Sequence, residues 1–187
     1  AAAANGQEPG DIKVQDVDGN GVITTDDRII YSQRPDVTFG FNNTFNYKGF
    51  DLSVFLYARL GQWIAYDYNT TYRINALENG GNVDYWTPEN PTNAFPRPNK
   101  SKSYTQVTYY STLKYEDGSF FKIRDITLGY TFKPELLKHL NLSRLRVYAT
   151  AKNFFTFSKI DNYDPEQGGS ISFPMTKQLV FGLNVEF

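Results

Sequence analysis

The sequence predicts an all-β protein built from antiparallel strands. Five segments alternate between apolar and polar residues with a period of two, at 37–47, 50–60, 120–132, 143–154 and 177–187. This is the pattern of strands that have one apolar and one polar face. Aromatic residues make up 17% of the 187 residues, and Asn, Thr and Gly are abundant, which favours strands and polar loops over helices.

The connections between these segments also fit antiparallel pairing. Lys48-Gly49 separates the first two segments and predicts a tight hairpin turn. In the third segment the alternation changes phase near Arg124 and Asp125, which predicts a β-bulge there. The link 133–142 has Pro134 near its start and predicts a short helical turn.

Composition excludes several classes of protein. The formal net charge is -1 and the isoelectric point is about 5.9, so nothing indicates nucleic-acid binding. Cys is absent, which excludes a disulfide scaffold and a Cys zinc site. The longest apolar run, 54–58, has five residues, against about 20 for a transmembrane helix and about 9–11 for a transmembrane strand.

Alternation alone does not separate a soluble β-sandwich from a membrane barrel. Three features favour the barrel. The apolar faces carry no charge and end in aromatic residues, the polar faces are rich in Asn, Thr, Gly, Lys and Arg, and the connections alternate between short and long. The last segment, closed by Phe187, resembles the C-terminal signal of outer-membrane barrels. Because single-chain barrels have at least about eight strands, we expect five strands to be part of a larger wall.

Several motifs in order resemble one family, the SusC/RagA TonB-dependent outer-membrane transporters. They are GDIKVQDVDGNGVITTDDRII at 10–30, VDYWTPENPTNAFPRP at 83–98, KYEDGSFFKIRDITLGYTF at 114–132, LRVYATAKNFFTFSKIDNYDPE at 145–166 and FPMTKQLVFGLNVEF at 173–187. The resemblance covers nearly the whole chain from Gly10 onward.

The resemblance implies the C-terminal strands of a large antiparallel transmembrane β-barrel of about 22 strands with long extracellular loops. It implies an outer-membrane location in a Gram-negative bacterium, a SusD-like lipoprotein lid, and import of oligosaccharides or peptides. Energy would come through the TonB complex, acting on an N-terminal plug that is not among these residues.

The expected organisation follows from this comparison. Residues 1–9 are unassigned, as a linker or an added remnant, and 10–187 form the C-terminal part of the barrel. Within that part we expect an extracellular calcium-type loop at 10–35, a hairpin at 36–60, a long extracellular loop at 61–119 and the last three strands at 120–187.

The segment DVDGNGVITTDD at 16–27 fits the calcium-loop pattern D-x-[DN]-x-[DN]-G. The expected Ca²⁺ ligands are Asp16, Asp18, Asn20, the carbonyl of Val22, Thr24 and Asp27. The alternative is a plain Asp/Gly/Asn turn. No flanking pair of helices is apparent, so a bound Ca²⁺ would be structural rather than sensory.

Aromatic and basic residues supply candidate contacts to an imported ligand or to the lumen, because aromatic rings stack on sugars. They are Tyr57, Arg59, Trp63, Tyr66, Trp86 and Tyr148. For the residues of the loop 61–119, the alternative is internal packing of that loop.

The sequence does not predict an enzyme. Asp161, Asp164 and Glu166 cluster in one loop, where we expect solvated acids rather than a hydrolytic pair. His139 is the single His, and no nucleophile motif accompanies it. The rival prediction is a secreted calcium-dependent β-sandwich that binds carbohydrate, and a glycoside hydrolase is a third class.

Overall fold

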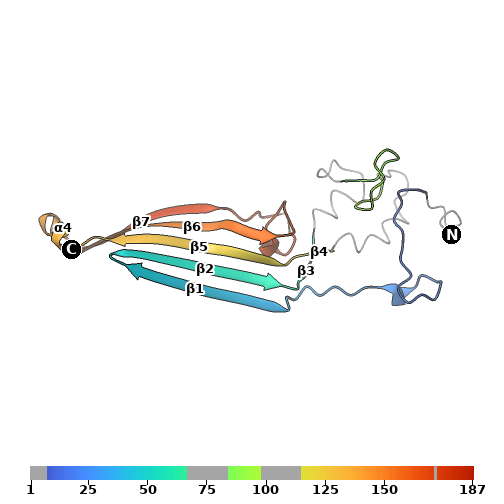
Figure 1. The fold of residues 1–187 in the computed structure, drawn as a ribbon, viewed down its shortest axis with the longest axis horizontal. Helices are drawn as coiled ribbons and strands as arrows, with labels where there is room; N and C mark the ends of the chain where they lie inside the picture. The colour runs from blue at the N-terminus through green and yellow to red at the C-terminus, as the bar shows by residue number, and fades with distance from the viewer. Residues whose placement is uncertain (1–7, 67–83, 98–114, 171) are drawn as a thin grey trace. The chain divides into compact units, whose positions relative to one another are not determined.

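The structure, a computed structural model, describes residues 8–66, 84–97, 115–170 and 172–187 (Figure 1). The chain divides into two compact units. The sheet unit comprises residues 34–62, 117–167 and 173–187, and the loop unit comprises the described residues of 1–33, 63–116 and 168–172. Each unit is described separately.

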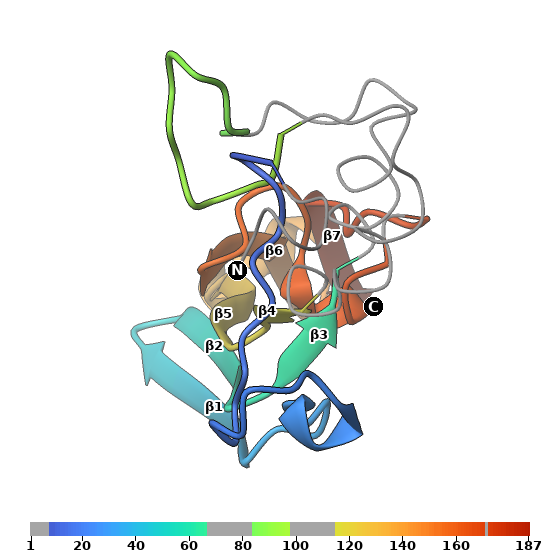
Figure 2. The same cartoon turned by 90° about the vertical axis from the view of Figure 1, so that its right-hand side faces the viewer.

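The sheet unit is one antiparallel sheet of five strands in the order β1-β2-β5-β6-β7 (Figure 1). The strands are β1 Val37–Tyr47, β2 Phe50–Leu60, β5 Phe120–Thr131, β6 Arg144–Ser158 and β7 Gln178–Glu186. Seen from its end, the sheet curves from β1 to β7 (Figure 2). The five predicted strands are confirmed, and each pairs with the previous one along the sheet.

The turn between β1 and β2 is as tight as predicted. Tyr47 pairs with Phe50, and the two turn residues Lys48 and Gly49 have φ angles of 48° and 91°. Two successive positive φ angles match the right-handed twist of a hairpin. A Cβ at Gly49 would approach the carbonyl oxygen of Thr131 to 2.8 Å, so both backbone conformation and space favour glycine there.

The predicted β-bulge is confirmed. The register between β5 and β6 shifts between Ile123 and Asp125, and the register between β2 and β5 shifts opposite the same place. Opposite it on β6, Asn153 has a φ of 57°. This left-handed residue breaks the alternation, which explains why the sequence predicts an end at 154 while β6 continues to Ser158.

The link between β5 and β6 folds as a short helical turn, as predicted. It contains α4 Pro134–Leu137 and the 3-10 turn η4 Lys138–Leu140, and Asn141 ends it with a φ of 54°. Leu137, the last residue of α4, is buried. Among the described residues no helix is long and apolar enough to cross a membrane.

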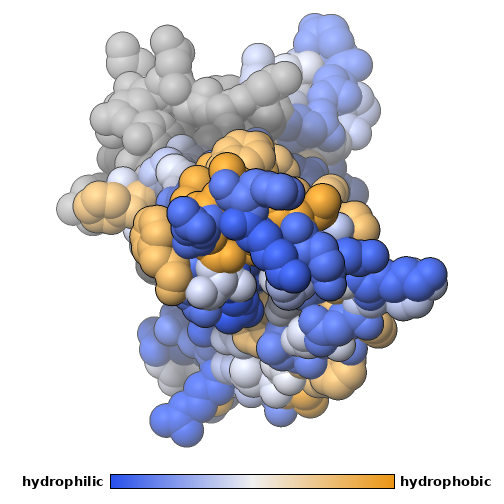
Figure 3. All heavy atoms as spheres, turned by 90° about the vertical axis from the view of Figure 1, so that its left-hand side faces the viewer, coloured by the Kyte–Doolittle hydropathy of each residue, from blue (hydrophilic) through white to orange (hydrophobic). Residues whose placement is uncertain are grey.

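The apolar face of the sheet is exposed. Large side chains on this face include Phe41, Leu128 and Phe181, which are 49%, 51% and 73% exposed. Hydrophobic side chains accordingly lie on the surface beside hydrophilic ones at the α4 end of the molecule (Figure 3). Large apolar side chains exposed on one face of a sheet indicate that this face contacts an apolar partner or lipid.

The described residues of 61–119 contain short elements that the sequence did not predict. β3 Trp63–Ala65 and β4 Tyr115–Asp117 form a two-stranded sheet, and Tyr85 pairs with Phe95 in an isolated bridge. The predicted long loop 61–119 thus contains short strands among its described residues, which are too short for their alternation to be recognised in the sequence, and its extracellular position stays a prediction. The 3-10 turn η2 Thr25–Asp27 forms the end of the predicted calcium loop.

Candidate functional site

Three carboxylates converge in the predicted metal loop. Asp16, Asp18 and Asp27 each place one carboxylate oxygen within 4.8 Å of the other two. Like charges this close repel each other, and a hard cation such as Ca²⁺ would relieve that repulsion, since it takes several carboxylate and carbonyl oxygens as ligands. The oxygen donor set fits calcium.

The backbone of this loop wraps around Asp16. Its Oδ1 accepts a hydrogen bond from the backbone N–H of Gly19 at 2.8 Å, and its Oδ2 accepts one from Gly21 at 2.7 Å. Gly19 and Gly21 have φ angles of 75° and 84°, a conformation that favours glycine. The sequence pattern D-x-x-G-x-G is therefore needed to close the loop around a carboxylate.

Asp27 fastens the far end of the loop. Its Oδ1 accepts from the N–H of Val17 at 2.7 Å, and its Oδ2 accepts from the N–H of Thr24 at 2.6 Å. Thr24 in turn accepts from Asp26 and completes a capping box on η2. The backbone hydrogen bonds from Thr24 and Val17 hold the pKa of Asp27 below its ordinary value, which keeps this carboxylate charged.

The other predicted ligands lie in the same loop and make local hydrogen bonds. Asn20 Nδ2 donates to Asp18 Oδ2 at 2.7 Å, and Asn20 Oδ1 accepts from the N–H of Val22 at 2.7 Å. The structure thus brings together the three carboxylates of the predicted set. The roles of Asn20, Val22 and Thr24 as metal ligands stay predictions.

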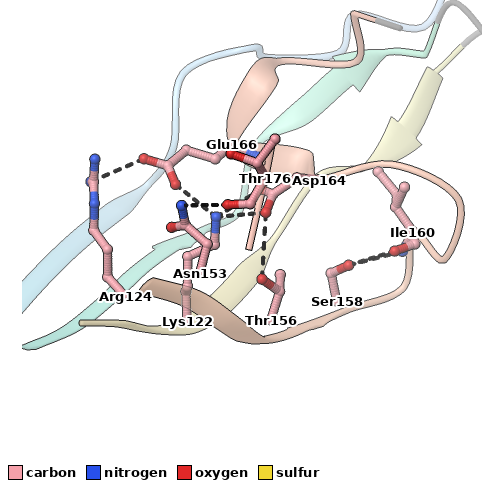
Figure 4. A network of polar contacts seen from close by, with 9 residues as sticks. All are labelled: Lys122, Arg124, Asn153, Thr156, Ser158, Ile160, Asp164, Glu166 and Thr176. Carbon is pink, nitrogen blue, oxygen red and sulfur yellow. Dashed lines mark hydrogen bonds and ion pairs between the residues drawn. The ribbon is translucent and has the colours of Figure 1, made fainter. Parts of the chain in front are cut away.

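A buried ion cluster lies on the polar face of the sheet (Figure 4). Lys122 is fully buried, and its Nζ donates to Asp164 Oδ1 and Oδ2 at 2.8 and 2.7 Å and to Glu166 Oε2 at 2.8 Å. The two carboxylates are only 12% and 11% exposed. The sequence-based expectation of solvated acids is therefore wrong for Asp164 and Glu166, whereas Asp161 is exposed as expected.

Further contacts hold residues 164–166 against the sheet. Arg124 lies 3.0 Å from Glu166 Oε1, and Thr156 Oγ1 donates to Asp164 Oδ2 at 3.4 Å (Figure 4). Pro165, which opens the turn η5 Pro165–Gln167, is also buried. Two cations balance two carboxylates here, so removal of one cation would leave a nearly buried carboxylate uncompensated.

Tyr57 and Arg59 lie together on the polar face, next to this cluster. Arg59 Nε donates to Tyr57 Oη at 2.8 Å, and its guanidinium lies 5.6 Å from the centroid of the Tyr57 ring. The Arg124 guanidinium lies 5.5 Å from the same centroid. The Phe120 ring is 5.8 Å from it.

Tyr148 belongs to a different part of the polar face. It pairs with Gly129 across the strands, whereas Tyr57 pairs with Lys122. The Arg146 guanidinium lies 4.9 Å from the centroid of its ring, and Arg146 Nε donates to Asp51 Oδ1 at 2.9 Å. The structure therefore groups Tyr57 with Arg59 but does not bring Tyr148 to them.

The loop-unit aromatics pack among themselves. The rings of Tyr31 and Trp63 have centroids 4.6 Å apart, and Trp63 is 36% exposed. Tyr66 is only 4% exposed, so its ring is a poor contact for a ligand. Trp86 packs over Gly10, where a Cβ would collide with its ring. These contacts fit the packing alternative, and a ligand role for Trp63, Tyr66 and Trp86 stays a prediction.

Comparisons with known proteins agree on one class. No family model matches the chain. The chain is 30% identical over 210 residues to TonB-dependent receptor P3 of Formosa agariphila, an alignment with all of this chain and 20% of the relative. It is 31% identical over 181 residues to TonB-dependent receptor SusC of Bacteroides thetaiotaomicron, covering 92% of this chain and 17% of that protein.

Solved structures give the same result. The RagAB peptide importer in its closed-closed state matches with a TM-score of 0.68 and 27% identity, over 92% of this chain and 20% of that one. Its open-open state matches with a TM-score of 0.64 over 90% of this chain. The chain spans about a fifth of the length of the curated relatives it matches.

Proposed function

Because the chain belongs to the SusC/RagA type of TonB-dependent receptor, as C-terminal strands of its β-barrel, we propose that the complete receptor imports oligosaccharides or peptides across the outer membrane. A SusD-like lipoprotein closes its outer mouth, and the TonB complex acts on its N-terminal plug. The solved relative is a peptide importer, which supports peptides as one ligand class.

The observation that carries this proposal is the two-faced sheet. Its apolar face, which includes Phe41, Leu128 and Phe181, carries no charged residue and is exposed, as the lipid-facing side of a barrel requires. Its polar face carries the Lys122 cluster and the Tyr57–Arg59 pair, as a lumenal wall can. A secreted β-sandwich would cover the apolar face with a second sheet, and in the described residues the second sheet consists of β3 and β4 alone.

Uptake by cells tests this function. Cells that express the complete receptor with its lipoprotein are exposed to a set of fluorescent oligosaccharides and a set of fluorescent pentapeptides. We expect accumulation of members of one set, lost on deletion of the receptor and on deletion of TonB. Accumulation that is unchanged in both deletions contradicts the proposal.

We further propose that the loop 16–27 binds one structural Ca²⁺. The three converging carboxylates of Asp16, Asp18 and Asp27 support this, with Asn20, the Val22 carbonyl and Thr24 as the remaining candidate ligands. The bound ion would neutralise the cluster and hold the loop in one conformation. At millimolar external calcium even a weak extracellular-type site is occupied.

Calcium content of the purified full-length receptor tests the metal site. The double substitution Asp16→Asn with Asp18→Asn keeps the side-chain shapes but removes two charges, so we expect it to lose one equivalent of bound calcium by mass spectrometry. The matched control is Asp26→Asn, because Asp26 lies in the same loop but outside the carboxylate cluster. Equal calcium in the double variant and in the wild type contradicts the metal site.

A further inference from the structure

We propose that Arg59, Tyr57 and Arg124 form a binding site for a carboxylate of the imported ligand on the lumenal wall. The proposal rests on the import function above and deepens it, because it assigns the ligand an acidic character. The site lies on the polar face of neighbouring strands, since Tyr57 and Arg59 are on β2 and Arg124 is at the bulge of β5.

The bulge brings the three side chains together. Tyr57 pairs with Lys122 on β5, and the register shift that follows in β5 leaves Arg124 outside the regular ladder. Its guanidinium and that of Arg59 lie 5.5 and 5.6 Å from the centroid of the Tyr57 ring, within the range of a cation–π contact. Two like-charged guanidinium groups are thereby held around one aromatic ring.

Arg59, Tyr57 and Arg124 have hydrogen-bond donors that a ligand can use. Arg59 Nε donates to Tyr57 Oη, and because that oxygen accepts a hydrogen bond here, the hydroxyl hydrogen of Tyr57 is available to another acceptor. In the part of the chain that the structure describes, no carboxylate pairs with Arg59. Arg124 is 39% exposed and uses one nitrogen for Glu166, which leaves further N–H groups for a second acceptor.

The charge balance indicates a singly charged partner. The positive charges of Lys122 and Arg124 are balanced by the negative charges of Asp164 and Glu166. Among these five residues, the positive charge of Arg59 therefore has no opposite charge. A carboxylate supplies one negative charge in a plane that matches the guanidinium fork. Arg124 already makes one such charged contact, since its Nη1 lies 3.0 Å from Glu166 Oε1. Uronic-acid sugars and acidic peptides both present such a group.

Binding of paired probes to the purified full-length receptor tests the proposal. One pair is oligogalacturonate and its neutral methyl ester. The other is a capped alternating alanine–glutamate pentapeptide and its glutamine counterpart. We expect at least one acidic probe to bind about tenfold more tightly than its neutral counterpart, as a hydrogen-bonded charge can provide, and the pair that shows the preference identifies the source of the carboxylate.

Substitutions then locate the preference. Arg59→Gln is expected to remove the preference for the acidic probe, and Arg59→Lys to keep only part of the preference, because the charge remains but the fork is lost. The control is Arg144→Gln. Arg144 lies at the other end of the polar face, is 51% exposed and pairs with Glu186, so this variant should keep the preference.

Two results overturn the proposal: equal binding of acidic and neutral probes by the wild type in both pairs, or a preference that Arg59→Gln leaves intact. Heat-modifiable migration on gels verifies that each variant is folded. TonB-dependent uptake is measured separately. If the wild-type receptor shows no TonB-dependent uptake but still prefers the acidic probe, the import function is refuted and the carboxylate site is supported. The two measurements therefore distinguish failure of the import proposal from failure of the carboxylate site.

Discussion

The interactions that stabilise the sheet unit differ from those that stabilise the loop unit. In the sheet unit, backbone hydrogen bonds between neighbouring strands join all five strands. In the loop unit, single carboxylates hold each loop: Asp16 accepts from two glycine backbone N–H groups, and Asp84 accepts from the side chains of Thr92 and Asn90. Order in the first unit is therefore distributed, and order in the second depends on a few side chains.

This difference predicts where single substitutions act. A substitution on an exposed strand face leaves the ladders intact, so its effect should be small unless it leaves a buried charge or overfills a close contact. A substitution in the loop unit should act locally, on one loop, and leave the sheet unchanged. The predictions below go from the largest expected effect to the smallest.

The largest effect is expected at the exception within the sheet, Lys122. Lys122→Met would leave Asp164 and Glu166 nearly buried without their cation, and breaking such a pair costs about 3–5 kcal/mol. The matched control is Lys152→Met on the same face, since Lys152 is 47% exposed and 3.9 Å from Asp125 and an exposed pair contributes about 0–1 kcal/mol.

Urea titration of the full-length receptor, followed by heat-modifiable migration, measures both variants. Equal destabilisation by Lys122→Met and Lys152→Met would show that the buried cluster contributes no more than a surface pair. Asp164 and Glu166 would then be held mainly by the packing of Pro165.

A smaller effect is expected from glycines on the polar face. A Cβ at Gly182 would collide with the ring of Tyr148, whereas a Cβ at Gly40 would meet the Phe55 ring at an ordinary 3.7 Å. We expect Gly182→Ala to cost about 1–3 kcal/mol, as overpacking does, and Gly40→Ala to be nearly neutral. The same urea titration compares them, and equal midpoints would mean that the Tyr148 ring moves freely out of the way.

In the loop unit, Gly10 and Gly19 separate backbone strain from packing. Both have positive φ angles, 87° and 75°, but a Cβ at Gly10 would collide with Trp86 while nothing lies within 4 Å of one at Gly19. Gly19→Ala should cost only the backbone term of roughly 1–2 kcal/mol, and Gly10→Ala should cost more. Hydrogen exchange of 84–97 should accelerate in Gly10→Ala alone, and acceleration in both variants contradicts this.

The smallest effect is a dependence on pH. Hydrogen bonds from Thr92 and Asn90 hold the pKa of Asp84 below its ordinary value. Since the folded-state pKa is the lower one, this carboxylate stabilises its loop above the ordinary pKa of Asp, and the stabilisation is lost as the pH falls through the folded value, below about pH 4.

Hydrogen exchange of 84–95, corrected for the intrinsic rate at each pH, should show this loss in the wild type. Asp84→Asn should be less protected at neutral pH and should lack the acid transition. An identical acid transition in Asp84→Asn would assign it to another group.

The same difference between the units explains what the sequence could predict. Alternation revealed the five strands, and its change of phase revealed the bulge at Arg124, because a strand's face is set by local order in the chain. The Lys122 cluster escaped prediction because it joins β5 to η5, which are far apart in the sequence. The available signals were the pair of acids flanking Pro165 and a Lys that directly follows two Phe residues in a predicted strand.

The metal loop 16–27 was predicted only in part, unlike the strands, which were predicted, and the Lys122 cluster, which was not. Its spacing predicted which carboxylates converge, and Asp16, Asp18 and Asp27 do so, because the loop is short enough for local glycine turns to determine its path. The packing of Tyr66 and Trp86 could not be read from composition, since their neighbours depend on how the loop unit folds.

The most direct test of the account is an accessibility scan along β2 in the full-length receptor embedded in lipid bilayers. Nitroxide labels are placed at single introduced cysteines from Leu52 to Tyr57, in a chain segment that has no Cys of its own. The account predicts a period of two, with labels at Leu52, Val54 and Leu56 accessible to oxygen dissolved in lipid, and labels at Ser53, Phe55 and Tyr57 shielded from it. Uniform accessibility, or the opposite phase, would contradict the assignment of this sheet as a barrel wall.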